Sequence, residues 1–432
     1  MTGAPAARRE ILAAALLAGT LHGVLALVGV FAGLEGTYAH SDQVAYHAPT
    51  IAKMASEMPT PVITDYQSAT APGFHLVMSA LGALGAGEMT LRVLNVLFGA
   101  ALVVFATALV ASRAGGIAGV AFGAALALSP YTLNPSIWLA TDNLAALFVL
   151  AAFAAAMPLA AGRAPRAVVA GAAASILAVA AVAVRQIMAY AAAFPGAAIV
   201  ARACAERRLP RAGALLAAGV AVVPALALVA FLAWLWGGLV PPSFQQYHGS
   251  GGNPATPVYA LALVGIWGFA AFLGIPGFLR ELFTPRIALI ALLAGAACCI
   301  VPSNYVVHVR FGGVLWTIAS KFPSVMERSL FLVPLAAVGA AAIGAYLRLW
   351  SQAHDTAARG IGAYALFALL GSVAAQTANS QCFERYLQAP VLVFTAIAAT
   401  ALAGRNYRAM PLVAAAALAA VLSAMNILRG GA

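Results

Sequence analysis

The run ILAAALLAGTLHGVLALVGVFAGL, residues 11–34, decides the fold, because it carries no charged residue along its whole length. A helix needs about 20 mainly apolar residues to cross a hydrocarbon core of about 30 Å. The run follows Arg8 and Arg9, as a signal peptide would, but it is longer than the apolar part of a typical signal peptide. We therefore expect an uncleaved first transmembrane helix.

Comparable apolar runs recur to the end of the chain. The 432 residues are 63% hydrophobic and only 8% charged, whereas soluble domains are about 25% charged. Because lipid offers the backbone no hydrogen-bond partners, such runs are expected to be helical. The sequence predicts an all-α, polytopic transmembrane helical bundle that forms a single domain over residues 1–432. We expect about 13 spans, at residues 11–34, 90–111, 115–133, 142–161, 167–184, 187–203, 212–236, 258–278, 287–302, 329–347, 361–377, 388–404 and 411–428.

The net charge of +11 is distributed as membrane orientation requires. With the N-terminus in the cytoplasm, fifteen of the 23 basic residues fall on the cytoplasmic side, which follows the positive-inside rule. Most acidic residues fall on the opposite side. We therefore expect the lipid bilayer as a partner and no nucleic acid. The expected location is a bacterial inner membrane, or the endoplasmic reticulum membrane if the source is eukaryotic, with an extracytoplasmic site.

Four extracytoplasmic loops are expected. Residues 35–89 form a long first loop, in which the apolar stretch 74–84 is too short to span and is expected to lie at the membrane interface. Residues 237–257 are rich in Gly and Pro and are expected to form a flexible loop. Residues 303–328 mix aromatic and basic residues, and residues 378–388 are expected to form a short charged turn.

The cysteines and histidines do not predict a metal site. The four cysteines lack metal-ligand spacing, and no disulfide framework is expected. Five histidines fall on the extracytoplasmic side, but none shows helical metal-binding spacing; they are His40, His47, His75, His248 and His308. We expect no metal and no cofactor.

Asp42 is the candidate catalytic residue. It follows the first span in the stretch GTYAHSDQVAYH, between His40 and His47. A carboxylate at that place can act as a general base toward a hydroxyl group. The alternative is a solvated loop acid.

Asp142 and Arg185 are candidate binding residues at the extracytoplasmic ends of two spans. An ionised carboxylate at the edge of the lipid usually has a partner or a function, although Asp142 can also be explained as a favourable charge at a helix N-terminus. Arg185, followed by Gln186, interrupts a long apolar run. Its guanidinium can face a phosphate or pair with Asp142, and the alternative is an arginine at a turn that extends to the interface.

Further candidates lie in the last two extracytoplasmic loops. Glu384, Arg385 and Tyr386 are consecutive, and Arg328 precedes a span. Arginine binds phosphate through two parallel hydrogen bonds. For any single one of these residues, contact with anionic lipid headgroups or solvation in the loop is the better explanation.

Four stretches together resemble the GT-C polytopic glycosyltransferases, and most closely the dolichyl-phosphate-glucose-dependent alpha-1,2-glucosyltransferases of N-glycan precursor assembly. SDQVAYHAPTIAK followed by ITDYQSATAPGFHLVMSAL is similar to the family's Asp-Glu motif and Thr-Pro-Pro-Gly segment. LATDNLAALF resembles its Tyr-Thr-Asp stretch, VAVRQIMAY its Arg-Gln-Thr stretch, and FERYLQAP its closing Arg-Tyr-Tyr. The stretches occur in the family's order. In two departures, Gln43 stands where the second acid is expected, and Thr70-Ala71-Pro72-Gly73 lacks a proline.

The resemblance implies a membrane hexosyltransferase that takes a glucose-like sugar from a polyprenyl-phosphate donor to a glycan or lipid-linked acceptor. Asp42 would be the general base, and Arg385 and Arg328 would stabilise the leaving phosphate. Asp142 and Arg185 would shape the substrate pocket. The remaining substrate-binding candidates are His47, Gln186, Glu384 and Tyr386.

Other functions fit part of the pattern. A transporter or flippase of a lipid-linked sugar would also have many helices, but it predicts inverted repeats and acids in the middle of helices. A non-catalytic membrane subunit would not depend on Asp42. A protein mannosyltransferase or an aminoarabinose transferase would differ in the acceptor, which the sequence leaves open.

Overall fold

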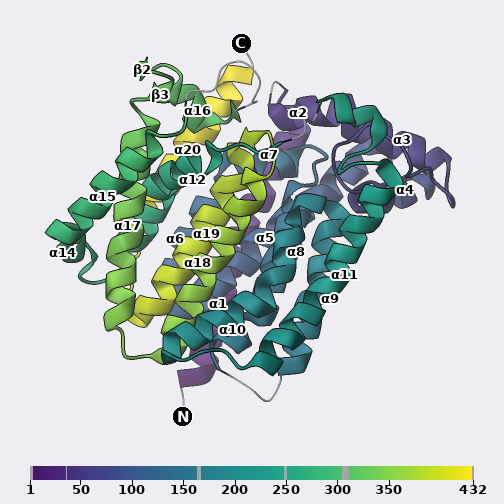
Figure 1. Ribbon diagram of the computed structural model, residues 1–432. Helices are drawn as coiled ribbons and strands as arrows, with labels where there is room; N and C mark the ends of the chain where they lie inside the picture. The colour runs from purple at the N-terminus through teal and green to yellow at the C-terminus, as the bar shows by residue number, and fades with distance from the viewer. Residues whose placement is uncertain (1–2, 36, 163–166, 248–250, 304–310, 431–432) are drawn as a thin grey trace.

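The long apolar runs form helices that lie side by side in one bundle (Figure 1). This computed structural model describes residues 3–35, 37–162, 167–247, 251–303 and 311–430. The two ends of the chain lie at opposite ends of the bundle. We call the end near the N-terminus the N-terminal face and the other the site face.

Among the described residues, eleven helical segments are long and apolar enough to cross a membrane. They are α1 (Gly3–Ala32), α5 (Glu88–Ala114), α8 (Asp142–Ala160), α9 (Ala167–Val184), η3 with α10 (Gln186–Ala193 and Phe194–Glu206), α11 (Ala212–Trp236), α12 with η5 and α13 (Thr256–Leu263, Val264–Gly268 and Phe269–Leu273), α17 (Leu332–Gln352), α18 (Thr356–Thr377), α19 with η6 (Glu384–Ala403 and Gly404–Asn406) and α20 (Met410–Gly430). The all-α polytopic prediction is therefore confirmed.

A further apolar segment is broken into two helices. The predicted span 115–133 is instead α6 (Gly116–Ala127) followed by α7 (Pro130–Ile137), with a bend of 60° between them. Pro130 begins α7, and the side chain of Ser129 accepts a hydrogen bond from the Tyr131 amide. Proline has no backbone donor and favours the first turn of a helix, which explains why a new helix starts here.

The predicted count of about 13 spans is not confirmed. The segment expected at 287–302 forms α15 (Pro285–Cys298), whose 14 residues are fewer than the roughly 20 that a full crossing needs. It follows the short helix α14 (Phe278–Leu282) and leads to the site face.

Short elements cover the site face. The first loop contains α2 (Tyr38–Asp42), η1 (Gln43–His47), α3 (Ala48–Ser56) and α4 (Gly73–Ala83), and the later loops contribute η4 (Pro242–Tyr247), β1 (Phe311–Gly312), α16 (Val314–Ala319), β2 (Ser324–Val325), β3 (Arg328–Ser329) and β4 (Cys382–Phe383). Strand β1 pairs in parallel with β4, and β2 pairs antiparallel with β3. The expected turn 378–388 is shorter than predicted, because α19 already begins at Glu384.

Small and aromatic residues pack the interior of the bundle. The rings of Phe153 and Tyr364 stack with centroids 4.3 Å apart, and Phe394 packs beside them. A side chain at Gly339 of α17 would collide with the Leu261 carbonyl of α12. Helices in membranes approach closely where small residues face one another, as α12 and α17 do here.

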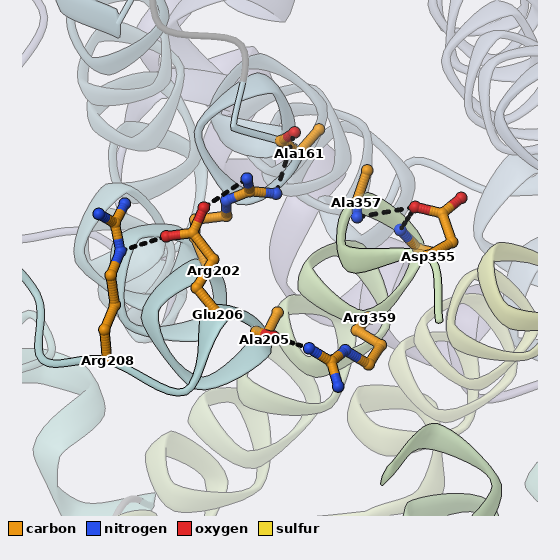
Figure 2. Close-up of polar contacts among 9 residues, drawn as sticks. Ala161, Arg202, Ala205, Glu206, Arg208, Asp355, Ala357 and Arg359 are labelled. Atoms are coloured by element: carbon orange, nitrogen blue, oxygen red, sulfur yellow. Dashed lines mark hydrogen bonds and ion pairs between the residues drawn. The ribbon is translucent and has the colours of Figure 1, made fainter. Parts of the chain in front are cut away.

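Polar side chains at the N-terminal face serve mainly to join helix ends (Figure 2). Glu206 at the end of α10 forms ion pairs with Arg202 and Arg208. Asp355 caps α18 by accepting hydrogen bonds from the Ala357 and Ala358 amides at 2.8 and 3.1 Å. Arg359 of α18 donates to the Ala205 carbonyl of α10, and this bond joins the two helix ends (Figure 2).

Candidate active site

Four charged residues from distant parts of the chain meet at the site face. Asp42 ends α2, and Asp142 is the first residue of α8. Arg185 lies between α9 and η3, and Arg385 lies in the first turn of α19. The Arg385 Nη1 atom is 2.5 Å from Asp42 Oδ2, and the Arg185 Nη1 atom is 2.8 Å from Asp142 Oδ1. Arg185 therefore forms the ion pair with Asp142 that the sequence suggested.

Tyr386 joins the two ion pairs. Its hydroxyl accepts a hydrogen bond from Arg385 Nη2 at 3.0 Å. The guanidinium carbons of Arg185 and Arg385 lie 4.6 and 5.0 Å from its ring centroid. A cation over an aromatic face is attracted by the ring quadrupole, so one tyrosine positions both guanidinium groups.

Asp42 and Arg385 line a cavity of about 450 Å³, which we call the Asp42 cavity. Its other walls come from α7, from residues 312–317 and from the end of α20. The volume lies in the range of small-molecule binding sites. A second cavity of about 60 Å³ lies on the α8 side of Arg385, where Asp142 and Tyr386 meet apolar side chains.

The backbone that carries Asp42 is fixed by its neighbours. Thr37 caps α2 by accepting a hydrogen bond from the His40 amide. Gln43 is buried; its side-chain oxygen accepts from the Leu139 amide at 2.6 Å, and its amide nitrogen donates to Glu88 at 2.6 Å. Gln43 thus joins the end of α2 to the segment before Asp142.

His47 ends η1, a single π-helical turn directly after Asp42, and π-helical turns are frequent at functional sites. Its Nδ1 atom lies 2.9 Å from Nε2 of His75 in α4, and both rings are buried. Burial lowers the pKa of His47 to about 4, although Asp42 acts in the opposite direction. The pKa of His75 is also lowered, mainly by burial and then by His47. At neutral pH both imidazole rings are uncharged, and their contact joins η1 to α4.

Glu384 holds the wall of the cavity rather than facing it. Its carboxylate is buried and accepts hydrogen bonds from the Leu315 amide at 2.8 Å and the Tyr259 hydroxyl at 3.1 Å. The Tyr131 hydroxyl accepts from the Val314 amide at 2.6 Å. The bonds from the Leu315 and Val314 amides attach the start of α16 to the bundle.

Two predicted binding residues contact the backbone instead of the cavity. Gln186 donates to the Ala69 and Leu239 carbonyls, both at 2.7 Å, and so joins the first loop to the loop after α11. Arg328 donates to the Cys299 carbonyl at 2.9 Å and also to the carbonyls of Ile300 and Met326. A cation is favourable at a helix C-terminus, and Arg328 occupies that position at the end of α15.

Apart from Asp42 and Arg385, the residues that line the cavity were not predicted. Tyr38 and Tyr131 are aromatic walls, and Asn426 approaches from α20. The Asn134 side chain donates to the Asn426 side-chain oxygen at 2.7 Å. A polar residue near the end of an apolar run was the only sequence signal for Asn426, and no motif accompanies it.

Among the residues that the structure describes, no group of three His, Cys, Asp or Glu residues could hold a metal ion. His248 and His308 lie outside the described residues.

No protein-family model matches the chain, and no curated protein matches it. Among solved structures, the chain is similar to ArnT from Cupriavidus metallidurans in the apo state, with 17% identity and a TM-score of 0.37 over 89% of this chain and 77% of that chain. It is also similar to ArnT from Cupriavidus metallidurans bound to undecaprenyl phosphate, with 18% identity and a TM-score of 0.41 over 94% of this chain and 77% of that chain.

Proposed function

We propose that the chain is a membrane glycosyltransferase that transfers a sugar from a polyprenyl-phosphate donor to a hydroxyl of a glycan or lipid-linked acceptor. The observation that carries the proposal is the meeting of Asp42, Asp142, Arg185 and Arg385. Each comes from a different one of the four stretches that resemble the GT-C enzymes. Asp42 and Arg385 are 343 positions apart in the sequence, so their contact is a property of the fold.

Asp42 acts as the general base in this mechanism. One of its oxygens is bonded to Arg385, which fixes the orientation of the carboxylate at the cavity. The other oxygen accepts the proton of the acceptor hydroxyl as that hydroxyl attacks the anomeric carbon of the donor. A positioned base typically contributes a factor of about 100 or more to the rate.

Arg385 stabilises the leaving group. As the bond between the anomeric carbon and the phosphate oxygen breaks, the electron pair and the negative charge move to the polyprenyl phosphate. Arg385 lines the Asp42 cavity, and its guanidinium keeps donor capacity for that oxygen, because the Nε atom has no hydrogen-bond partner among the described residues. Such donors, fixed in advance where charge develops, lower the barrier most. Arg328 was expected to share this role, but its guanidinium donates to three backbone carbonyls, so we assign the role to Arg385 alone.

The positions of the acids favour this function over transport. Asp42, Asp142 and Glu384 all lie at helix ends on the site face. Secondary transporters bind their substrates near the midplane of the bilayer, between broken helices. At the break between α6 and α7, a ring nitrogen of His22 lies 3.1 Å from the Ala127 carbonyl, so the protein itself supplies a partner for this carbonyl.

Turnover of a labelled donor in proteoliposomes tests the proposal. The purified chain is given a polyprenyl-phosphate hexose together with a glycan and lipid extract as the acceptor source. Cleavage of the donor with release of polyprenyl phosphate is expected, whereas movement of intact donor across the bilayer without cleavage would establish a flippase instead. Arg385→Lys, which loses the paired donors of the guanidinium, should be strongly impaired. Arg328→Lys is the matched control and should retain the rate.

A further inference from the structure

A cavity of about 860 Å³ opens at the N-terminal face, at the opposite end of the bundle from the Asp42 cavity. It lies between α1, α6 and α20, and we call it the N-terminal groove. Helix α6 packs against both of the other helices, so the groove is a hollow between packed spans. Its volume lies in the upper part of the range of small-molecule sites. No step of the proposed transfer uses it.

Apolar side chains form the walls of the groove. Ala14, Ala121 and Ala416 are buried where they line it, whereas Leu17 is an exposed lining residue. Leu17 lies seven residues beyond Glu10 on α1, so the groove extends about 10 Å along that helix from the N-terminal face. At that depth a span is surrounded by hydrocarbon rather than water. The body of the groove therefore fits an acyl chain.

Arg405 and Glu10 lie at the mouth of the groove. Arg405 Nη1 is 3.3 Å from Glu10 Oε2, and both side chains are more than half exposed. An exposed ion pair of this kind contributes little to stability, so a better acceptor can take the place of Glu10. A guanidinium has five N–H donors and binds a phosphate through two parallel hydrogen bonds. Arg405 is therefore suited to a phosphate at the mouth.

The chain on both sides of this ion pair is basic. Arg8 and Arg9 precede Glu10 on α1, and Arg408 follows Arg405 directly after the η6 turn. All four arginine side chains are exposed. Basic residues at the end of a span attract anionic headgroups. Positive charge at the mouth and apolar walls behind it match the two parts of an anionic phospholipid.

We propose that the N-terminal groove binds one anionic phospholipid from the leaflet at this face. The lipid phosphate takes the place of Glu10 at Arg405, and an acyl chain lies along α1 and α6 toward Leu17. The inference is independent of the transferase proposal, because its residues lie at the other end of the bundle from Asp42.

Native mass spectrometry of the purified full-length chain measures this binding. The chain is delipidated in a neutral detergent and titrated with dioleoyl phosphatidylglycerol or dioleoyl phosphatidylcholine, which share acyl chains and differ in headgroup charge. Wild type should bind phosphatidylglycerol at least about 5-fold more tightly, the factor that one arginine contributes beside an anionic lipid. Excess inorganic phosphate should not displace the lipid, because it has no chain to fill the groove.

Two substitutions at the ion pair should act in opposite directions. Arg405→Gln removes the phosphate donor and should weaken phosphatidylglycerol binding about 5-fold or more. Glu10→Gln removes the competing carboxylate and should strengthen the binding by a similar factor. If the pair only joined two helix ends, both variants would change the binding in the same direction. Arg211→Gln removes an exposed charge before α11 at the same face; it is the matched control and should bind as wild type does.

A third substitution tests the apolar part of the groove. Ala13 is an exposed residue of α1 that lines the groove, so Ala13→Phe fills it without disturbing the packed interior. Phosphatidylglycerol binding should weaken about 10-fold, the factor for about two buried methylene groups. Ala414→Phe is the matched control, because Ala414 is an exposed residue of α20 outside the lining. It should leave the binding unchanged.

Four results would overturn the proposal. The first is equal binding of the two lipids by wild type, and the second is weaker phosphatidylglycerol binding by Glu10→Gln. The third is wild-type binding by Ala13→Phe. The fourth is a dimer that carries no lipid, which would assign the groove to a second copy of the chain.

Discussion

Asp142 and Arg185 neutralise one another where water has little access, since their side chains are only 13% and 9% exposed. Removing one partner of a buried ion pair leaves the other charge without compensation, which costs about 3–5 kcal/mol. Asp142→Asn should lower the free energy of unfolding by about that amount, and Arg185→Gln in the same chain should restore part of it.

Denaturant titration of the purified protein in detergent measures this change. Glu10→Gln is the matched control, because Glu10 pairs with Arg405 at the surface, where both side chains are more than half exposed. It should change the free energy of unfolding by less than about 1 kcal/mol. An equally small effect of Asp142→Asn would show that the buried pair does not stabilise the site.

The His47–His75 pair predicts acid sensitivity. The pKa of His47 is about 4 in the folded chain, mainly because of burial, against an ordinary value of 6.5. Between these values the unfolded chain binds the extra proton, so stability is complete above pH 6.5 and falls as the pH drops toward 4. Thermal unfolding from pH 8 to pH 4 should therefore show a steeper fall for wild type than for His47→Gln. The exposed His354→Gln should follow wild type, and an unchanged slope in His47→Gln would refute the explanation.

At the scale of elements, α16 depends on a glycine. Gly313 has a φ of +141°, and an added Cβ would collide with the Glu384 side chain and lie 2.9 Å from the Tyr131 hydroxyl. Glu384 cannot move away without losing its bonds to Leu315 and Tyr259. Gly313→Ala should displace α16 and lower the transfer rate about 10- to 100-fold, the factor expected from 1–3 kcal/mol of local strain.

Gly87→Ala is the control for that experiment, because a Cβ at Gly87 meets nothing within 4 Å. Initial rates of sugar transfer and the melting temperature of both variants are compared. If Gly313→Ala has the melting temperature of wild type but a slower rate of sugar transfer, the role of α16 in the cavity wall is supported. Wild-type transfer by Gly313→Ala would contradict it.

The sequence predicted the elements better than it predicted their contacts. Long apolar runs identify spans because each must satisfy its own backbone in lipid. The break at Ser129 was not predicted, because Pro130 lies inside an apolar run whose composition alone indicates one continuous span. Asp42, Asp142, Arg185 and Arg385 were found because charge is rare beside lipid.

The remaining cavity residues depend on long-range packing. Asn426 reaches the cavity only because α20 packs beside α7, 292 positions from Asn134. Tyr38 is one aromatic residue among many, and the sequence does not show that it lines the cavity. The residue types of Arg328 and Gln186 indicated that both side chains form hydrogen bonds. They did not indicate that the partners are backbone carbonyls.

At the scale of the whole molecule, the termini lie at opposite ends of the bundle (Figure 1). The excess of basic residues at the N-terminal face predicts that this face is cytoplasmic. In a cysteine-free background, Thr60→Cys in the first loop should react with an impermeant maleimide in intact cells. Gln352→Cys, at the end of α17, should react only after permeabilisation. The reverse pattern would place the site in the cytosol and contradict the proposed delivery of the donor.

Asp42→Asn is the most direct test of the central claim, that this carboxylate activates the acceptor at the end of a membrane bundle. Transfer of labelled sugar from a polyprenyl-phosphate hexose to endogenous acceptors is measured in membranes that contain equal amounts of folded protein. Asp355→Asn is the matched control, because asparagine caps a helix as well as aspartate does. The account predicts a loss of about 100-fold or more for Asp42→Asn and an unchanged rate for Asp355→Asn. Transfer by Asp42→Asn at the wild-type rate would contradict it.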